Sequence, residues 1–210
     1  MTTNKTIYLI RHGQTDYNLK GIVQGSGIDS DLNERGRSQA LDFHKAYRHI
    51  PFDFIYTSEL KRTHQSVAPF IEQGLPWKSL PELNEINWGV FEGLETTPES
   101  RQAFQDIIAS WRSGDLNKPI DGGESPVEMY ARQEQGWDKI LSDNHQNILV
   151  CMHGRAMRSF LSLLLNTPLR DMDQYPHTNL CLYTLEKNGE TNCRLLIKND
   201  VRHLKAFKPS

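Results

Sequence analysis

The residues best suited to chemistry are Arg11, His12 and Gly13, which directly follow the apolar run Ile7–Ile10. Such a run is typical of a short buried strand. A guanidinium and an imidazole at a strand end, followed by a glycine that lets the backbone turn tightly, suit an anion site. Arginine also matches phosphate oxygens in a bidentate way. The pattern therefore predicts an anion-binding site at this strand end.

A second histidine stands in the same kind of place. His153 and Gly154 follow the mostly apolar run 147–152, which also has the pattern of a buried strand. Two strand-end histidines, each opening onto a glycine turn, predict two halves of one pocket.

Several further sequence blocks accompany these histidines in a fixed order. With them the chain resembles the histidine phosphatase superfamily, which includes the cofactor-dependent phosphoglycerate mutases and the phosphatase half of the fructose-2,6-bisphosphate enzymes. An Arg-His-Gly triplet alone occurs by chance, whereas the ordered set spans most of the chain and is highly specific. The blocks are 11–15 (RHGQT) with Asn18, 32–36 (LNERG), 57–63 (TSELKRT), 83–85 (LNE) followed by 88–89 (WG) and 91–93 (FEG), 122–125 (GGES) and 153–154 (HG).

The resemblance implies a role for each residue of the predicted pocket. His12 is the nucleophile that forms a phosphohistidine, while Arg11, Arg62 and His153 bind the phosphoryl group and stabilise its charge. Glu85 donates a proton to the leaving oxygen, because an alkoxide leaves poorly without one. The cationic neighbours are expected to lower the pKa of His12 and so favour the free imidazole.

Three further residues are expected to contact the substrate. The resemblance implies that Asn18 hydrogen-bonds the phosphate, and Gln24 and Gly154 are predicted to line the same site. Backbone N–H groups at the start of the helix after His153 would add donors. No metal and no cofactor are expected. Metal binding by Cys151 and His153, which share a strand face, is conceivable but much weaker because no further ligand cluster is apparent.

Most of these residues also have a purely structural interpretation. A single histidine at a strand end is more often a hydrogen-bonded structural residue, and the run around Arg62 could be a solvated helix face. The joint occurrence of the pocket residues at family-matching positions favours function for them. For four others the structural and functional interpretations are about equally supported: Trp88, Phe91, Glu92 and Glu124.

The choice between mutase and phosphatase depends on three differences between this sequence and the phosphoglycerate mutases of the family that it resembles. Ile86 stands where they carry an arginine after the acidic residue, Arg155 stands where they usually carry asparagine, and the segment 86–123 is shorter and lacks a basic pair. We therefore predict a metal-independent phosphomonoester hydrolase for a small phosphorylated metabolite, most similar to the fructose-2,6-bisphosphatase branch. A phosphoglycerate mutase and a catalytically inactive phosphate-binding adaptor remain the alternatives.

Length, charge and composition limit the domain number, the partners and the location that the sequence allows. The 210 residues suffice for one α/β domain, and 24 basic against 26 acidic residues give no reason to expect nucleic acid or an acidic membrane surface. No segment has the apolar length of a signal or a membrane span, which predicts a cytoplasmic protein. Three cysteines without C-x-x-C spacing are expected to be buried thiols: Cys151, Cys181 and Cys193. The oligomeric state is left open.

The elements that would position these residues alternate between strand and helix patterns. This alternation predicts a three-layer α/β sandwich, with a mostly parallel sheet and helices on both faces. The whole chain, 1–210, is predicted to be one domain with a small cap insertion at about 86–123. Strands are expected at 6–10, 53–57, 147–152, 180–187 and 193–199, the last two as a hairpin around Asn188-Gly189. Helices are expected at about 33–49, 59–72, 99–112, 125–142 and 155–165, the fourth starting with a capping box of Ser125 and Glu128.

Overall fold

The computed structural model describes residues 4–95, 97–189 and 192–204 and contains a six-stranded sheet in the order β3-β2-β4-β1-β5-β6. The first four strands in this order run parallel, and β5 and β6 are antiparallel to their neighbours. This arrangement confirms the predicted mostly parallel sheet. The strands are β1 Lys5–Arg11, β2 Phe54–Thr57, β3 Trp77–Ser79, β4 Asn147–Met152, β5 Leu182–Lys187 and β6 Arg194–Asp200.

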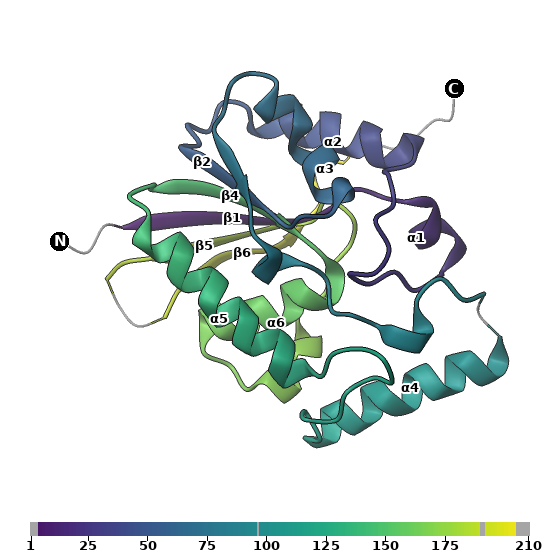
Figure 1. Cartoon of the computed structure of the whole chain (residues 1–210). Coiled ribbons are helices and arrows are strands. Elements are labelled where there is room, and N and C mark those ends of the chain that lie inside the picture. Colours follow the sequence, from purple (N-terminus) through teal and green to yellow (C-terminus); the bar gives the residue numbers. More distant parts are fainter. Residues whose placement is uncertain (1–3, 96, 190–191, 205–210) are drawn as a thin grey trace.

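Helices cover both faces of the sheet (Figure 1). α2 (Glu34–Tyr47) and α3 (Lys61–Ile71) pack on one face, and α5 (Pro126–Ser142) and α6 (Gly154–Leu165) pack on the other. The side chains of β1 alternate between two hydrophobic clusters: Ile7 and Leu9 join the cluster beneath α5 and α6, whereas Ile10 joins the one beneath α2 and α3. The α/β sandwich is thus confirmed.

The predicted cap segment is built around α4 (Pro98–Ser113), which lies outside the layers that cover the sheet (Figure 1). Its Phe104 and Trp111 pack on Trp88, with ring centroids 4.9 and 5.7 Å away. Three short 3₁₀ helices connect other elements: η1 Pro81–Leu83, η2 Gly89–Phe91 and η3 Leu169–Gln174. The interpretation of 86–123 as a cap, and of the chain as one domain, stays a prediction.

Besides the 3₁₀ helices, two short elements were not predicted from the sequence, β3 and α1 (Asp16–Lys20). β3 has three residues at the sheet edge, two of them exposed, so no apolar alternation marks it. α1 has five residues and no buried side chain; it depends on a capping box between Thr15 and Asn18. The capping box predicted at Ser125 and Glu128 is present at the start of α5. β5 and β6 pair as expected, although residues 190 and 191 of their connection lie outside the described residues.

Two glycines bring separate sequence blocks into contact. A Cβ on Gly36 would overlap the carbonyl oxygen of Gln14, and one on Gly13 would lie 2.7 Å from the carbonyl oxygen of Gly36. The loop after β1 and the start of α2 therefore touch through their backbones, and Asn33 reinforces the contact by donating its N–H to the Gln14 carbonyl at 2.9 Å. This contact explains why the 32–36 block accompanies the first histidine.

The three cysteines are buried and free, as predicted from their strand-like surroundings. Burial raises the pKa of the Cys151 and Cys193 thiols, which keeps them protonated at neutral pH. Among the described residues, no helix combines the length and the apolar character that a membrane crossing requires.

Candidate active site

The two strand-end histidines meet at one edge of the sheet. β1 and β4 are parallel neighbours, and their register pairs Arg11 with Met152, the last residues of the two strands. His12 and His153 come next, so the sheet holds them side by side with ring centroids 5.2 Å apart. Both side chains are buried. Ligands of α/β sheets bind outside the carboxyl ends of the strands, and this edge is such a place.

Hydrogen bonding determines which nitrogen of His12 can react. Its Nδ1 lies 2.7 Å from the carbonyl oxygen of Gly13. A carbonyl oxygen only accepts hydrogen bonds, so Nδ1 carries the proton. The lone pair of the neutral ring is therefore on Nε2, which is left available for an incoming electrophile.

The surroundings keep His12 neutral at physiological pH. Burial, followed by the charges of Arg62 and Arg11, lowers the pKa of His12 well below its usual value. The effect of the two arginines agrees with the sequence expectation, but burial contributes more. A neutral imidazole has the free lone pair that a nucleophile needs.

His153 has the opposite tautomer. Nε of Arg62 donates to its Nδ1 at 3.1 Å, and because a guanidinium can only donate, Nδ1 must be the unprotonated nitrogen. Nε2 then carries the proton, which it donates to Oγ of Ser58 at 2.8 Å. Burial and the charge of Arg62 lower the pKa of His153 well below its usual value, so this ring is a neutral donor.

Arg62 is fully buried behind the two histidines. Besides the bond to His153, its Nη1 and Nη2 donate to the carbonyl oxygens of Ile28 at 2.6 Å and Gly25 at 3.0 Å. Burial lowers the pKa of Arg62 to about 10, which is still far above neutral pH. Arg62 is therefore a fixed positive charge, not the solvated helix residue of the structural alternative.

Arg11 is oriented by a residue that the sequence analysis did not identify. Its Nη1 lies 3.1 Å from Nδ1 of His177, which must accept the bond. Burial, and then the charge of Arg11, lowers the pKa of His177 to about 3, so this ring is a neutral acceptor. A Cβ on Gly154 would lie 2.9 Å from the His177 ring, which explains the glycine there. No motif in the sequence marks His177.

The carboxylate of Glu85 rests on the N-terminus of α6. Oε1 accepts from the backbone N–H groups of Ile86 at 3.0 Å and Ala156 at 2.8 Å, and Oε2 accepts from that of Arg155 at 3.0 Å. The first N–H groups of a helix have no partner within the helix and attract negative charge. This position brings Glu85 next to the helix that begins at Gly154.

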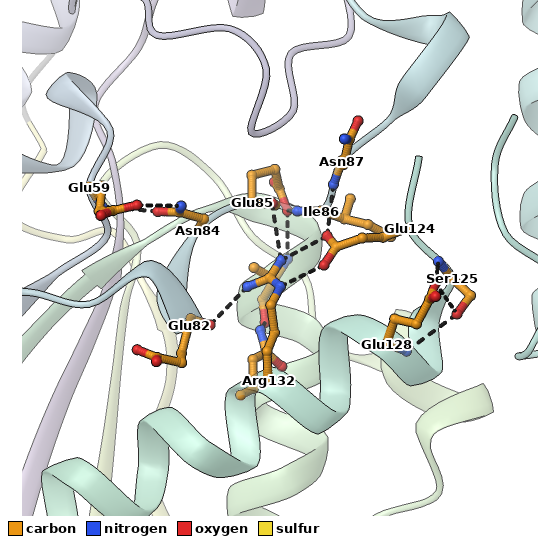
Figure 2. Close-up of polar contacts among 12 residues, drawn as sticks. Glu59, Glu82, Asn84, Glu85, Ile86, Asn87, Glu124, Ser125, Glu128 and Arg132 are labelled. Atoms are coloured by element: carbon orange, nitrogen blue, oxygen red, sulfur yellow. Dashed lines mark hydrogen bonds and ion pairs between the residues drawn. The ribbon is translucent and has the colours of Figure 1, made fainter. Parts of the chain in front are cut away.

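Arg132 of α5 holds the segment that carries Glu85 (Figure 2). Its Nη1 donates to the carbonyl oxygen of Glu82 at 2.8 Å and its Nη2 to that of Glu85 at 3.1 Å. Its Nε and Nη2 also bind both carboxylate oxygens of Glu124, at 2.7 and 3.0 Å. Glu124 in turn accepts from the N–H of Asn87. Glu124 therefore has a positioning role, and Arg132 is a second residue that no sequence signal revealed.

The remaining uncertain residues differ in position. Oε1 of Glu92 accepts the Trp88 N–H at 2.9 Å, and its carboxylate fills the space that side chains on Gly25 and Gly27 would need. This arrangement favours the structural interpretation of Glu92. Trp88 lines the cavity described below, whereas Phe91 packs on the ring of Phe104 in α4.

The two predicted amides are used differently. Oδ1 of Asn18 accepts from the Thr15 N–H and from the Asn179 amide, at 3.3 and 3.1 Å, which leaves the NH₂ group of Asn18 as a donor. Gln24 uses both of its polar atoms within the loop: Nε2 donates to Thr15 Oγ1 and Oε1 accepts from Ser30 Oγ, both at 2.7 Å. Asn18 is thus the better placed of the two to bind an anion.

These residues surround a cavity of about 310 Å³. Arg62 and His153 do not line it, since both lie fully buried behind the wall. Besides apolar lining residues, three cavity residues with charged or polar side chains were not predicted to bind substrate: Arg155, Arg158 and His177. Among the described residues, no group of three or more histidine, cysteine or acidic side chains could hold a metal. The cavity is lined by Arg11, His12, Asn18, Ile22, Val23, Gln24, Glu85, Trp88, Phe104, Gly154, Arg155, Arg158 and His177.

Known proteins share both the sequence pattern and the fold. The chain is 29% identical over 167 residues to the adenosylcobalamin/alpha-ribazole phosphatase of Salmonella typhimurium, covering 77% of this chain and 80% of the relative. It is 30% identical over 172 residues to the 2,3-bisphosphoglycerate-dependent phosphoglycerate mutase of Bartonella tribocorum, covering 76% and 81%. A phosphatase and a mutase are thus about equally similar in sequence to this chain.

A solved structure shows the same fold over nearly the whole chain. The mycobacterial glucosyl-3-phosphoglycerate phosphatase Rv2419c, in complex with VO3, superposes with a TM-score of 0.83 at 24% identity, covering 94% of this chain and 100% of that one. The family model of the histidine phosphatase superfamily (branch 1) matches residues 7–200, which include both strand-end histidines and every block between them. The chain therefore belongs to the histidine phosphatase superfamily, branch 1.

Proposed function

We propose that the protein is a metal-independent phosphomonoester hydrolase that acts on a small phosphorylated metabolite through a phosphohistidine. One observation carries the proposal: the hydrogen bond from His12 Nδ1 to the Gly13 carbonyl leaves the Nε2 lone pair for the cavity that Arg11 and Glu85 also line. A nucleophile, a fixed cation and a proton donor thus share one space. The phosphatase names of several relatives, which refer to small phosphorylated metabolites, support this substrate class.

In the first step, Nε2 of His12 attacks phosphorus while the bond from phosphorus to the ester oxygen breaks. Arg11, which lines the cavity, stabilises the charge on the transferring oxygens, and the fixed charge of buried Arg62, which His153 helps to hold, adds to this from behind the wall. Glu85 gives its proton to the departing alkoxide. Its Oε2 accepts only one backbone hydrogen bond, so it has room for that proton.

In the second step, water attacks the phosphohistidine. Glu85, now ionised, takes a proton from this water as the new oxygen–phosphorus bond forms. The nitrogen–phosphorus bond breaks, and the electron pair returns to Nε2 of His12. Inorganic phosphate leaves, and the neutral histidine with its proton on Nδ1 is restored.

Trapping the intermediate tests the proposal. After brief mixing with p-nitrophenyl phosphate and alkaline denaturation, the protein should carry a phosphoryl group that acid removes, since phosphohistidine is labile to acid. Steady release of nitrophenol should accompany it. A protein that binds phosphate but neither turns over nor becomes phosphorylated would instead be the inactive adaptor.

Replacing Glu85 by Gln should separate good from poor leaving groups. Without the acid, we expect alkyl phosphates to lose about 10²–10³-fold in kcat, whereas p-nitrophenyl phosphate should lose less than about tenfold, because nitrophenolate needs little protonation. Thermal unfolding of the variant serves as the control, since the new amide NH₂ would face backbone donors at α6. Equal losses on both substrates would assign Glu85 to structure or binding.

Chelation should not affect activity. The positive charges of Arg11 and Arg62 supply the stabilisation that a divalent cation provides in other phosphoryl-transfer enzymes. We expect kcat/KM to change by less than about twofold after exhaustive EDTA treatment and gel filtration, within the scatter of such measurements. Loss of activity that Mg²⁺ or Mn²⁺ restores would contradict the mechanism.

Hydrolysis should exceed mutase transfer. Ile86 stands where mutases carry an arginine, and in this structure it is fully buried in the core instead of at the cavity. The test supplies 3-phosphoglycerate with catalytic 2,3-bisphosphoglycerate and follows 2-phosphoglycerate and free phosphate. Formation of 2-phosphoglycerate at roughly 1–1000 per second, well ahead of phosphate, would establish the mutase alternative that the Bartonella relative represents.

A further inference from the structure

Two arginines that line the cavity beside Glu85, Arg155 and Arg158, belong to a cluster around Asp173. Asp173 of η3 accepts from Arg155 at 2.7 Å and Arg158 at 2.6 Å, both through Oδ1, and from Arg112 of α4 at 2.7 Å through Oδ2. One carboxylate is therefore shared by three guanidinium groups. Burial alone would raise the pKa of Asp173, but the arginines outweigh it and hold the pKa below its usual value, so the carboxylate is ionised.

The charges of this cluster do not balance. Arg112 is 61% exposed, whereas Arg155 and Arg158 line the cavity and share Oδ1 of Asp173, so two cavity cations have one aspartate between them. The side chain of Arg155 is 8% exposed. Because the two guanidinium groups share one carboxylate, an anion in the cavity would compensate the remaining positive charge.

Two tryptophan rings and one hydrogen bond hold the Arg155 guanidinium, and its remaining N–H donors have no partner among the described residues. Its guanidinium lies 5.7 Å from the ring centroid of Trp88 and 5.8 Å from that of Trp111, within the range of cation–π attraction. Only its Nη1 has a hydrogen-bond partner among the described residues. Its Nε and Nη2 make no other hydrogen bond among the described residues, and Arg155 is one of the residues that line the cavity.

The position of Arg155 relates it to the leaving group. Its backbone N–H binds Oε2 of Glu85, the oxygen to which we assign the proton for the departing alcohol. The side chain of Arg155 lines the same cavity, close enough to Glu85 for their charges to interact, so it can contact the alcohol part of an ester whose leaving oxygen lies at Glu85. The excess charge therefore lies where a substituent of the alcohol would be.

We infer that Arg155, supported by Arg158, is a specificity residue that binds a second acidic group on the alcohol part of the substrate. The preferred substrate is then a phosphomonoester that also carries a carboxylate or a second phosphate. This inference rests on the proposed hydrolase function, because that mechanism places the leaving alcohol next to Glu85.

Two matched substrate pairs test the inference. 3-Phosphoglycerate and glycerol 3-phosphate differ by one carboxylate in place of a hydroxymethyl group, and 6-phosphogluconate and glucitol 6-phosphate differ in the same way over a longer chain. We expect kcat/KM to favour the acid in at least one pair by about tenfold or more, the size of one charge-assisted hydrogen bond. Ratios near one in both pairs would overturn the inference.

Variants then identify the residue responsible. Arg155→Gln should bring the favoured ratio to within about threefold of one, as expected when a charge-assisted bond is lost, and Arg155→Lys should restore part of it. Arg112→Gln is the control: it removes the same charge from Asp173 but no cavity donor, so the preference should persist. An unchanged ratio in Arg155→Gln would overturn the assignment.

Binding separates this inference from the proposed function. Calorimetry on His12→Ala, which lacks the nucleophile, measures the dissociation constants of the same four compounds. Tighter binding of the acids, lost in the double variant with Arg155→Gln, would support the inference even if the wild-type protein hydrolysed none of them. Hydrolysis of all four compounds with no preference in rate or binding would support the hydrolase and refute the inference.

Discussion

His12→Ala should lower kcat for phosphomonoesters by about 10⁴-fold or more, the loss typical of removing a covalent nucleophile. The expected size follows from the site: among its described histidines, no other unprotonated ring nitrogen is left free, since His153 and His177 each use theirs to accept from an arginine. Water alone would have to attack the phosphoryl group. The measurement is the release of nitrophenol under saturating substrate.

The matched control is His49→Ala. His49 is exposed near the end of α2, so its loss should leave kcat within about twofold of the wild type, as for most surface substitutions. Far-ultraviolet circular dichroism should be the same for both variants. If His12→Ala retained near-normal turnover with a native spectrum, the phosphohistidine mechanism would be wrong.

The second large effect is a steep loss of stability below pH 6.5. Three histidines of the site have lowered pKa values in the folded protein, because burial and neighbouring arginines oppose their charged form: His12, His153 and His177. In the unfolded chain each titrates near pH 6.5. Below that pH the unfolded state binds more protons than the folded state, so the free energy of unfolding falls as the pH falls.

The size of the effect follows from the difference between the protons bound by the unfolded state and those bound by the folded state. At pH 5, a histidine that protonates only when unfolded lowers the free energy of unfolding by up to about 2 kcal/mol relative to pH 7, so the three together reach about 6 kcal/mol at most. Urea unfolding at pH 7, 6 and 5 measures it. In His177→Gln, whose amide oxygen can still accept from Arg11, the part of the pH dependence that comes from the three site histidines should weaken by about one third. Burial also lowers the pKa of His203, which contributes equally to the wild type and the variant. A free energy of unfolding that stayed constant from pH 7 to 5 would contradict the three neutral histidines.

The fold was predictable where the sequence pattern is strong. The strand expected at 147–152 coincides with β4, because six consecutive residues have the composition of a strand buried on both faces. α5 begins where its capping box predicts. β3 could not be found in this way: Trp77 and Lys78 are exposed, and the strand exists because β2 offers a free edge for pairing.

Residues of the site could be predicted from the sequence only where they belong to a recognisable sequence block. Arg11, His12 and Glu85 were identified from their blocks, and the structure places them around one cavity. His177 and Arg132 lie outside any recognisable block, so their hydrogen bonds become visible only after distant segments pack together. The tautomers of the histidines likewise depend on tertiary contacts, which no single-sequence pattern encodes.

The place of β1 in the sheet has a consequence for how the chain folds. Its neighbours are β4 and β5, and the register joins residue 6 to residue 147 and to residue 186. During synthesis, the first strand therefore emerges long before either strand that can pair with it. Closing so long a loop is slow, as for other proteins of high contact order. We expect the central strand to be incorporated late, and the apolar segment from Ile7 to Ile10 to need protection by chaperones until then.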